Sequence, residues 1–210
     1  LYGGFIYHEI GAAAAQDYYT GFIIEKTLSM DNIFVISLVF SYFSIPRQYQ
    51  YRVLFWGILG VILLRGLLIG VGAEVVHRFE WVLYLFAAFL IYTGIKMLRG
   101  GDEEHDISHN PVIRFVRKYM RVTDSIHANK FFITLPDANT GKAARFATPL
   151  FMALVCVEFV DVIFALDSVP AIFAITTDAY IVYTSNIFAI LGLRALYFAL
   201  AALLHRFEYL

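Results

Sequence analysis

Charged residues and cysteine are both scarce in this chain of 210 residues. Only 16% of the residues are charged and 60% are hydrophobic, whereas a typical soluble domain has about 25% charged residues. Lys and Arg number 16 against 17 Asp and Glu, so the basic excess typical of nucleic-acid binding is missing. The single cysteine, Cys156, excludes an intrachain disulfide and a CxxC metal site. The sequence also lacks HExxH, GxSxG and P-loop motifs, and it predicts no enzyme.

Long apolar stretches dominate the rest of the sequence, and the mean hydropathy is +0.69. Stretches of about 20 apolar residues can cross a bilayer as helices. The predicted spans are residues 18–44, 53–76, 81–98, 148–176 and 180–204. A large soluble helical bundle is the alternative, but its outer helices would each need a polar face, which 53–76 and 180–204 lack. We therefore predict an all-α, polytopic transmembrane helical bundle in the lipid bilayer.

A polar loop separates the third span from the fourth, and we place it at residues 101–147. Within it, NPVIRFVRKYMRVTD (110–124) predicts a short amphipathic helix, and KFFITLPDANTGKAARFAT (130–148) predicts a β-hairpin with its turn at DANTG. Most basic loop residues fall on this side of the membrane, which therefore should be cytoplasmic. The segment EEHDISH (103–109) holds metal-binding residue types, but a solvated acidic loop is the better interpretation. These residues are Glu103, Glu104, His105, Asp106 and His109.

The two halves of the chain share landmarks in the same order. The landmarks are a pair of acids six residues apart (Glu25 and Asp31; Asp161 and Asp167), an arginine (Arg65; Arg194) and the tetrapeptide HRFE (77–80; 205–208). Each half holds three spans, the last of them truncated in the second half, so the halves should have inverted topology. We therefore predict a first repeat at 1–100 and an incomplete second repeat at 148–210, the plan of many secondary transporters.

Ionisable side chains inside the spans are the candidate functional residues, because a charge at the bilayer centre costs about 2.5–3.5 kcal/mol on insertion scales. The acids are Glu25, Asp31, Glu158, Asp161 and Asp167, and the bases are Lys26, Arg65 and Arg194. Five acids against three bases leave two negative charges that a divalent cation or two protons could neutralise. The alternative is structural: the bases balance the acids and hold the helices together.

Helical spacing brings some of these side chains onto one face. Glu25 and Asn32 are seven residues apart, as are Asp161 and Ser168, so each pair shares a helix face. Carboxylate, amide and hydroxyl oxygens suit Mg²⁺, Ca²⁺ or Mn²⁺ and argue against zinc or copper. The spacing therefore predicts an oxygen-rich metal site and does not distinguish among these three ions.

The second acid of each pair, Asp31 or Asp167, points about 120° away from the shared face in an ideal helix. Both can join the same site only where the helix is broken. Pro170 predicts such a break in the second half, because proline cannot donate to the carbonyl of Leu166. Freed carbonyls beside carboxylates are typical of ion sites in broken transporter helices.

Several motifs resemble those of the TerC family of integral membrane proteins, which includes the alkaline-inducible Alx proteins. They are EKTLSMDN (25–32), YTGIKML (92–98), VEFVDVIFALDSVP (157–170) and TSNIFAILGLRALYF (184–198). The resemblance implies a bacterial inner-membrane protein of the LysE-type transporter superfamily, associated with manganese export and tellurium resistance, with further spans at both ends. It also implies metal-binding roles for Glu25, Asp31, Asn32, Glu158, Asp161, Asp167 and Ser168.

We accordingly expect a transporter that exports Mn²⁺ from the cytoplasm, with protons as the exchanged ion. Only the family resemblance favours Mn²⁺ over other divalent ions as the substrate, and we expect no cofactor. The alternative is a TerC-type membrane factor that assists tellurium resistance, or insertion or metallation of other membrane proteins, without transport. Such a factor would use the loop at 101–147 as its docking surface.

Overall fold

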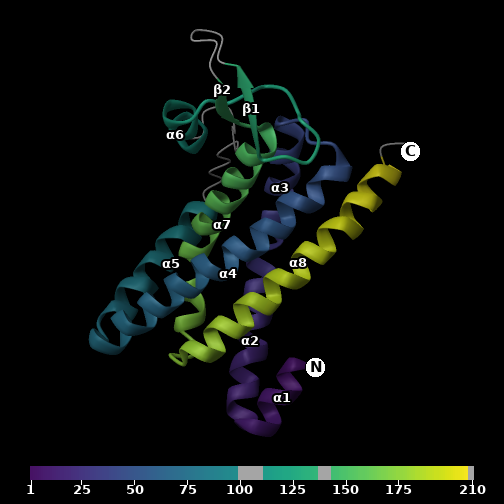
Figure 1. Ribbon diagram of the computed structural model, residues 1–210. Helices are drawn as coiled ribbons and strands as arrows, with labels where there is room; N and C mark the ends of the chain where they lie inside the picture. The colour runs from purple at the N-terminus through teal and green to yellow at the C-terminus, as the bar shows by residue number, and fades with distance from the viewer. Residues whose placement is uncertain (99–110, 137–142, 208–210) are drawn as a thin grey trace. The chain divides into compact units, whose positions relative to one another are not determined.

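The computed structural model describes residues 1–98, 111–136 and 143–207, most of which are helical (Figure 1). The helices are α1 (Tyr2–Glu9), α2 (Ala12–Leu28), α3 (Met30–Tyr42), α4 (Arg47–Arg78), α5 (Val82–Leu98), α6 (Pro111–Tyr119), α7 (Pro149–Phe173) and α8 (Ala179–Phe207). The two strands are β1 (Phe132–Pro136) and β2 (Ala143–Ala147), which pair antiparallel.

Two of the described helices, α4 with 32 residues and α7 with 25, are long and apolar enough to cross a membrane. At a rise of about 1.5 Å per residue, α4 is about 48 Å long, more than the roughly 30 Å of a hydrocarbon core. Shorter apolar helical stretches cover Val82–Ile95 in α5 and Ala179–Leu193 in α8. The helices therefore occupy the same parts of the chain as the predicted spans.

The first predicted span is not one continuous helix. α2 ends at Leu28 and α3 begins at Met30, with Ser29 in a turn between them. The Ser29 N–H donates to the Glu25 carbonyl at 2.8 Å, and the Asn32 N–H donates to the Ser29 carbonyl at 3.1 Å. The interruption therefore lies between two predicted ligands, Glu25 and Asn32.

The predicted break at Pro170 is wrong, because α7 continues through this proline to Phe173. Proline removes one backbone hydrogen bond, to Leu166, but the helix has only three residues left and its last turn is firmly packed. Ile172 and Phe173 are 0% and 2% exposed, within an apolar cluster that also contains Ile69 of α4. Burial of this last turn offsets the lost hydrogen bond.

The chain forms two compact units. One comprises the described parts of Leu1–Ile33, Val61–Asp102 and Val162–Leu210, and the other those of Phe34–Gly60 and Glu103–Asp161. Each predicted repeat contributes residues to both units. The division of the chain into two inverted three-helix repeats stays a prediction.

In the first unit, α2 packs along α8, and small residues permit the close approach. A Cβ atom added at Gly21 of α2 would lie only 2.9 Å from the Ser185 Oγ of α8. Further along, the end of the flexible Lys26 side chain reaches α8, where a Cβ at Gly192 would lie 2.7 Å from the Lys26 Nζ. Small residues at such contacts are typical of helix pairs in membranes.

In the second unit, the structure has a hairpin and an amphipathic helix where the sequence predicts them. Phe132 pairs with Ala147 at one end of the hairpin and Pro136 with Ala143 at the other. The predicted turn, DANTG, and the segment EEHDISH lie outside the described residues. α6 lies within the predicted stretch, from Pro111 to Tyr119, and its Ile113 and Val116 side chains are buried.

Candidate functional site

A buried ion pair between α2 and α4 forms the centre of the candidate site. The Arg65 Nη1 lies 2.6 Å from the Glu25 Oε1, and both residues are 0% exposed. Removing two charges from water costs several kcal/mol per ion. The fold therefore has to supply this pair with further polar partners.

Ser29, in the turn after α2, is the first of these partners. Its hydroxyl donates a hydrogen bond of 2.5 Å to the Glu25 Oε1, the same oxygen that faces Arg65. The four-residue spacing places Ser29 one helical turn from Glu25. The interruption between α2 and α3 thus provides a donor to the buried carboxylate.

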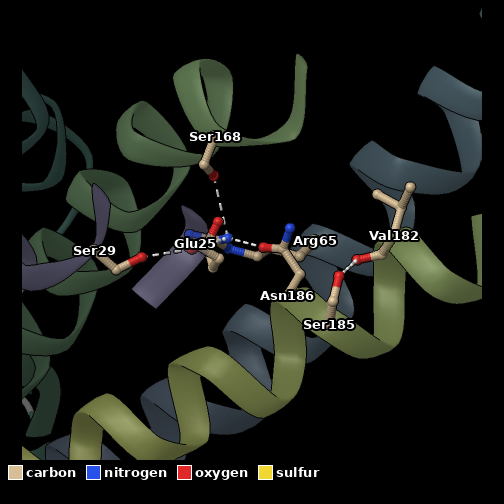
Figure 2. A network of polar contacts seen from close by, with 7 residues as sticks. All are labelled: Glu25, Ser29, Arg65, Ser168, Val182, Ser185 and Asn186. Atoms are coloured by element: carbon tan, nitrogen blue, oxygen red, sulfur yellow. Dashed lines mark hydrogen bonds and ion pairs between the residues drawn. The ribbon is translucent and has the colours of Figure 1, made fainter. Parts of the chain in front are cut away.

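Two further oxygens face the same arginine nitrogen, from α7 and α8 (Figure 2). The Ser168 Oγ lies 3.4 Å from the Arg65 Nη1, and Arg65 donates a hydrogen bond to the Asn186 Oδ1. Because arginine carries only donors, the Asn186 atom that faces it must be the oxygen. One cationic nitrogen of α4 is therefore surrounded by oxygens from α2, α7 and α8.

Other polar atoms of this unit are buried without a hydrogen-bond partner among the described residues. They are the Glu25 Oε2, the Asn32 Oδ1 and the Asn186 Nδ2. A buried polar atom left unsatisfied costs about 1–3 kcal/mol. The second Glu25 oxygen and the Asn32 oxygen could both accept a hydrogen bond or coordinate a cation.

The remaining predicted site residues are placed as follows. Asp161 is 6% exposed on α7 and belongs to the second compact unit, whereas Asp167, beside Ser168, is half-buried. The Glu158 carboxylate packs against the backbone of Gly60 in the second unit, where a Cβ would lie 2.7 Å from its Oε1. The side chains of Asp31 and Arg194 lie outside the described part of the structure.

Among the described residues, no group of three or more His, Cys, Asp or Glu side chains converges. The centre instead combines one carboxylate with an arginine, hydroxyls and an amide. Of the predicted charge-balancing residues, Arg65 pairs with Glu25, and the Lys26 amine lies against α8 at Gly192. Metal binding by these residues stays a prediction.

Asn186 is the member of the centre that the sequence analysis missed. It is 0% exposed within α8, in the motif TSN (184–186). Asn32 is predicted as a ligand because it lies seven residues from Glu25, whereas no acid lies seven residues from Asn186. A search for any strongly polar side chain within an apolar span would have found it.

Comparison with known proteins places the chain among membrane proteins. The profile of a family described as "Integral membrane protein TerC family" matches residues 10–210. An uncharacterized membrane protein of Rickettsia bellii is 49% identical over 210 residues, which are the whole chain and 68% of that protein. The "Putative membrane-bound redox modulator Alx" of Salmonella typhi is 48% identical over 202 residues, 96% of the chain and 61% of that protein. Alx of Escherichia coli K12 is also 48% identical, over 93% of the chain and 59% of its own length. No solved structure matches the chain.

Proposed function

Because this chain belongs to the TerC family of integral membrane proteins, we propose that it forms part of a transporter exporting divalent metal cations from the cytoplasm. The buried oxygen centre carries the proposal: Glu25, Ser168 and Asn186 direct oxygens from α2, α7 and α8 at one positive charge. Manganese is the proposed substrate, and the resemblance of the motifs to TerC proteins associated with manganese export supports this choice. Protons are the proposed exchanged ion.

The chemistry of the centre suits a hard cation. Carboxylate and amide oxygens prefer Mg²⁺, Ca²⁺ and Mn²⁺ over softer metals. Burial within the helices favours function as well, because charged groups inside a membrane segment are expensive and usually mark an ion pathway. Asp31, Asn32, Glu158, Asp161 and Asp167 are proposed as further metal ligands.

Manganese measurements in cells test the proposal. Cells that express the full-length protein should contain less manganese than cells with an empty vector. Glu25→Gln and Asp161→Asn should each reduce efflux about tenfold or more, because even loss of a group that supports a metal ligand costs about 10–100-fold in metal binding. Membrane levels of each variant are measured alongside.

Glu74→Gln is the matched control, since Glu74 is an exposed acid of α4 that pairs with Arg78 at 2.6 Å. It removes one carboxylate outside the centre and should keep full efflux. Equal manganese content with and without the wild-type protein would contradict the proposal.

A second candidate function is a non-transporting membrane factor that docks partner proteins through the polar loop. The favouring observation is an exposed aromatic pair on α6, where Phe115 and Tyr119 are 62% and 67% exposed. Their ring centroids are 4.7 Å apart.

The Alx relatives carry the name redox modulator, which would suggest a role based on a reactive thiol. The cysteine of this chain fits such a role poorly. The single cysteine of this chain, Cys156, is 0% exposed, and reactive thiols need access.

A further inference from the structure

The Arg65 guanidinium lies at the point where the oxygens of the candidate site converge. We propose that it is a built-in cation that competes with the transported metal ion for Glu25, Ser168 and Asn186. Binding of the ion displaces Arg65, and release of the ion lets it return. This inference rests on the proposed transport function and adds to it a mechanism for emptying the site.

The geometry around the Arg65 Nη1 is that of a small cation site. The nitrogen lies 2.6 Å from the Glu25 Oε1 and 3.4 Å from the Ser168 Oγ, and it also bonds to the Asn186 Oδ1. A terminal guanidinium nitrogen has two N–H groups, so it cannot give three well-aligned hydrogen bonds at once. Its positive charge, rather than a matched set of donors, accounts for three oxygens around it (Figure 2).

Burial strongly favours a positive partner beside the ionised Glu25 carboxylate. Glu25, Arg65 and Asn186 are 0% exposed and Ser168 is 2% exposed. A buried carboxylate that loses its positive partner is strongly unfavourable. Either Arg65 or a metal ion can therefore balance the Glu25 carboxylate, and the two cannot share one position.

The Glu25 carboxylate has a second buried oxygen besides the one that faces Arg65. The Glu25 Oε2 is buried without a hydrogen-bond partner in the described part of the chain. A divalent cation such as Mg²⁺ or Mn²⁺ collects several oxygen ligands, whereas a guanidinium nitrogen has only its two N–H groups to offer. The carboxylate thus has a second oxygen ready for an ion that displaces Arg65.

Competition of this kind lowers the apparent affinity for the ion, because only molecules with Arg65 withdrawn can bind it. If the withdrawn form is about 0.1–10% of the population, the Kd rises about 10- to 1,000-fold. A weakened affinity favours release on the far side of the membrane. A neutral Glu25–Arg65 pair would then allow the protein to return without a metal ion at Glu25.

Isothermal titration of the purified full-length protein with MnCl₂ tests the proposal directly. Arg65→Gln removes the competing charge and should bind Mn²⁺ about tenfold or more tightly than the wild type. The same variant should melt at a lower temperature without Mn²⁺ and show a larger rise in melting temperature on its addition. Exchange of bound ⁵⁴Mn²⁺ should be slower, since nothing displaces the ion.

Arg78→Gln is the matched control, because Arg78 is on the same helix but exposed and pairs with Glu74. It should bind Mn²⁺ as the wild type does. If Arg65→Gln fails to fold, Arg65→Lys serves instead. Lysine keeps the charge but carries it on a shorter side chain, which should reach the three oxygens less well. The Kd of Arg65→Lys should therefore also fall below the wild-type value.

The outcomes separate this inference from the proposed function. If the wild type binds Mn²⁺ and Glu25→Gln abolishes binding, the site stands. Unchanged or weaker binding by the Arg65 variants would then overturn the competition, and Arg65 would be structural. If neither the wild type nor any Arg65 variant binds Mn²⁺, both the inference and the proposed function are overturned.

Discussion

At the scale of single residues, Asn186 offers a test of how much the buried centre depends on its neutral member. Asn186→Leu keeps the approximate volume but removes the oxygen that accepts from Arg65. The arginine then loses a buried acceptor, so the free energy of unfolding should fall by about 1–3 kcal/mol. Denaturation in detergent micelles measures the change.

Thr184→Val is the control for that measurement. The Thr184 hydroxyl donates to the carbonyl of Tyr180 within α8, at 2.7 Å, so its removal leaves the centre intact. This variant should unfold within about 0.5–1.5 kcal/mol of the wild type, the net worth of an ordinary hydrogen bond. A larger loss for Thr184→Val than for Asn186→Leu would contradict the role given to Asn186.

The individual members of the centre were predictable to different extents. Glu25 and Arg65 stand out in the sequence, because charges are rare inside apolar spans. Their pairing was one of two alternatives left open, because helical spacing relates residues of one helix and says nothing about contacts between α2 and α4. The position of Ser168 beside Asn186 likewise depends on how α7 packs against α8.

At the scale of secondary-structure elements, the close contact between α2 and α8 positions Glu25 opposite Asn186. Gly21→Ala would place a methyl group 2.9 Å from the Ser185 Oγ and force the helices apart. Such overpacking costs about 1–3 kcal/mol, and the melting temperature in detergent should fall. Gly70→Ala on α4, where a Cβ would meet nothing within 4 Å, should leave it unchanged or raised.

A second substitution that removes the Ser185 hydroxyl tests whether its contact with the new methyl group causes the loss of stability. Adding Ser185→Ala to Gly21→Ala removes the hydroxyl that the new methyl group meets, and most of the lost stability should return. If the double variant is as unstable as the sum of its single changes, the two positions are energetically independent. The close approach of α2 to α8 at this point would then not explain the effect.

The positions of the spans followed from apolar run length, which is a property of the sequence alone. Their interruptions did not. In the sequence, Pro170 predicts a break, but packing of Ile172 and Phe173 keeps the helix intact there. The break occurs instead at Ser29, which has no proline or glycine beside it. The Ser29 hydroxyl bonds to Glu25 only four residues away, but the burial of that carboxylate against Arg65 of α4 is a tertiary feature that local propensity cannot reveal.

At the scale of the whole molecule, the two candidate functions differ in which part of the chain they need. A transporter needs the buried centre, and its flux should survive changes to the predicted cytoplasmic loop. A docking factor needs an exposed surface in that loop and should tolerate changes in the centre. Phe115 and Tyr119 are exposed, whereas Ile113 and Val116 of the same helix are buried. The pair can therefore be altered without unfolding α6.

The decisive experiment compares manganese efflux by two loop variants and one variant of the centre, all in the full-length protein. The loop variants are Phe115→Ser/Tyr119→Ser and, as the stronger change, replacement of residues 101–147 by a short flexible linker. The variant of the centre is Glu25→Gln. We expect both loop variants to keep manganese efflux at about the wild-type rate, because neither touches the centre, and Glu25→Gln to lose it. Loss of ⁵⁴Mn²⁺ from preloaded vesicles that contain the purified protein gives the efflux rate without contributions from other cell proteins. The opposite pattern, with efflux unaffected by Glu25→Gln and cellular manganese control lost in both loop variants, would assign the function to the loop. In that case the buried Glu25–Arg65 pair would serve only to hold α2 against α4.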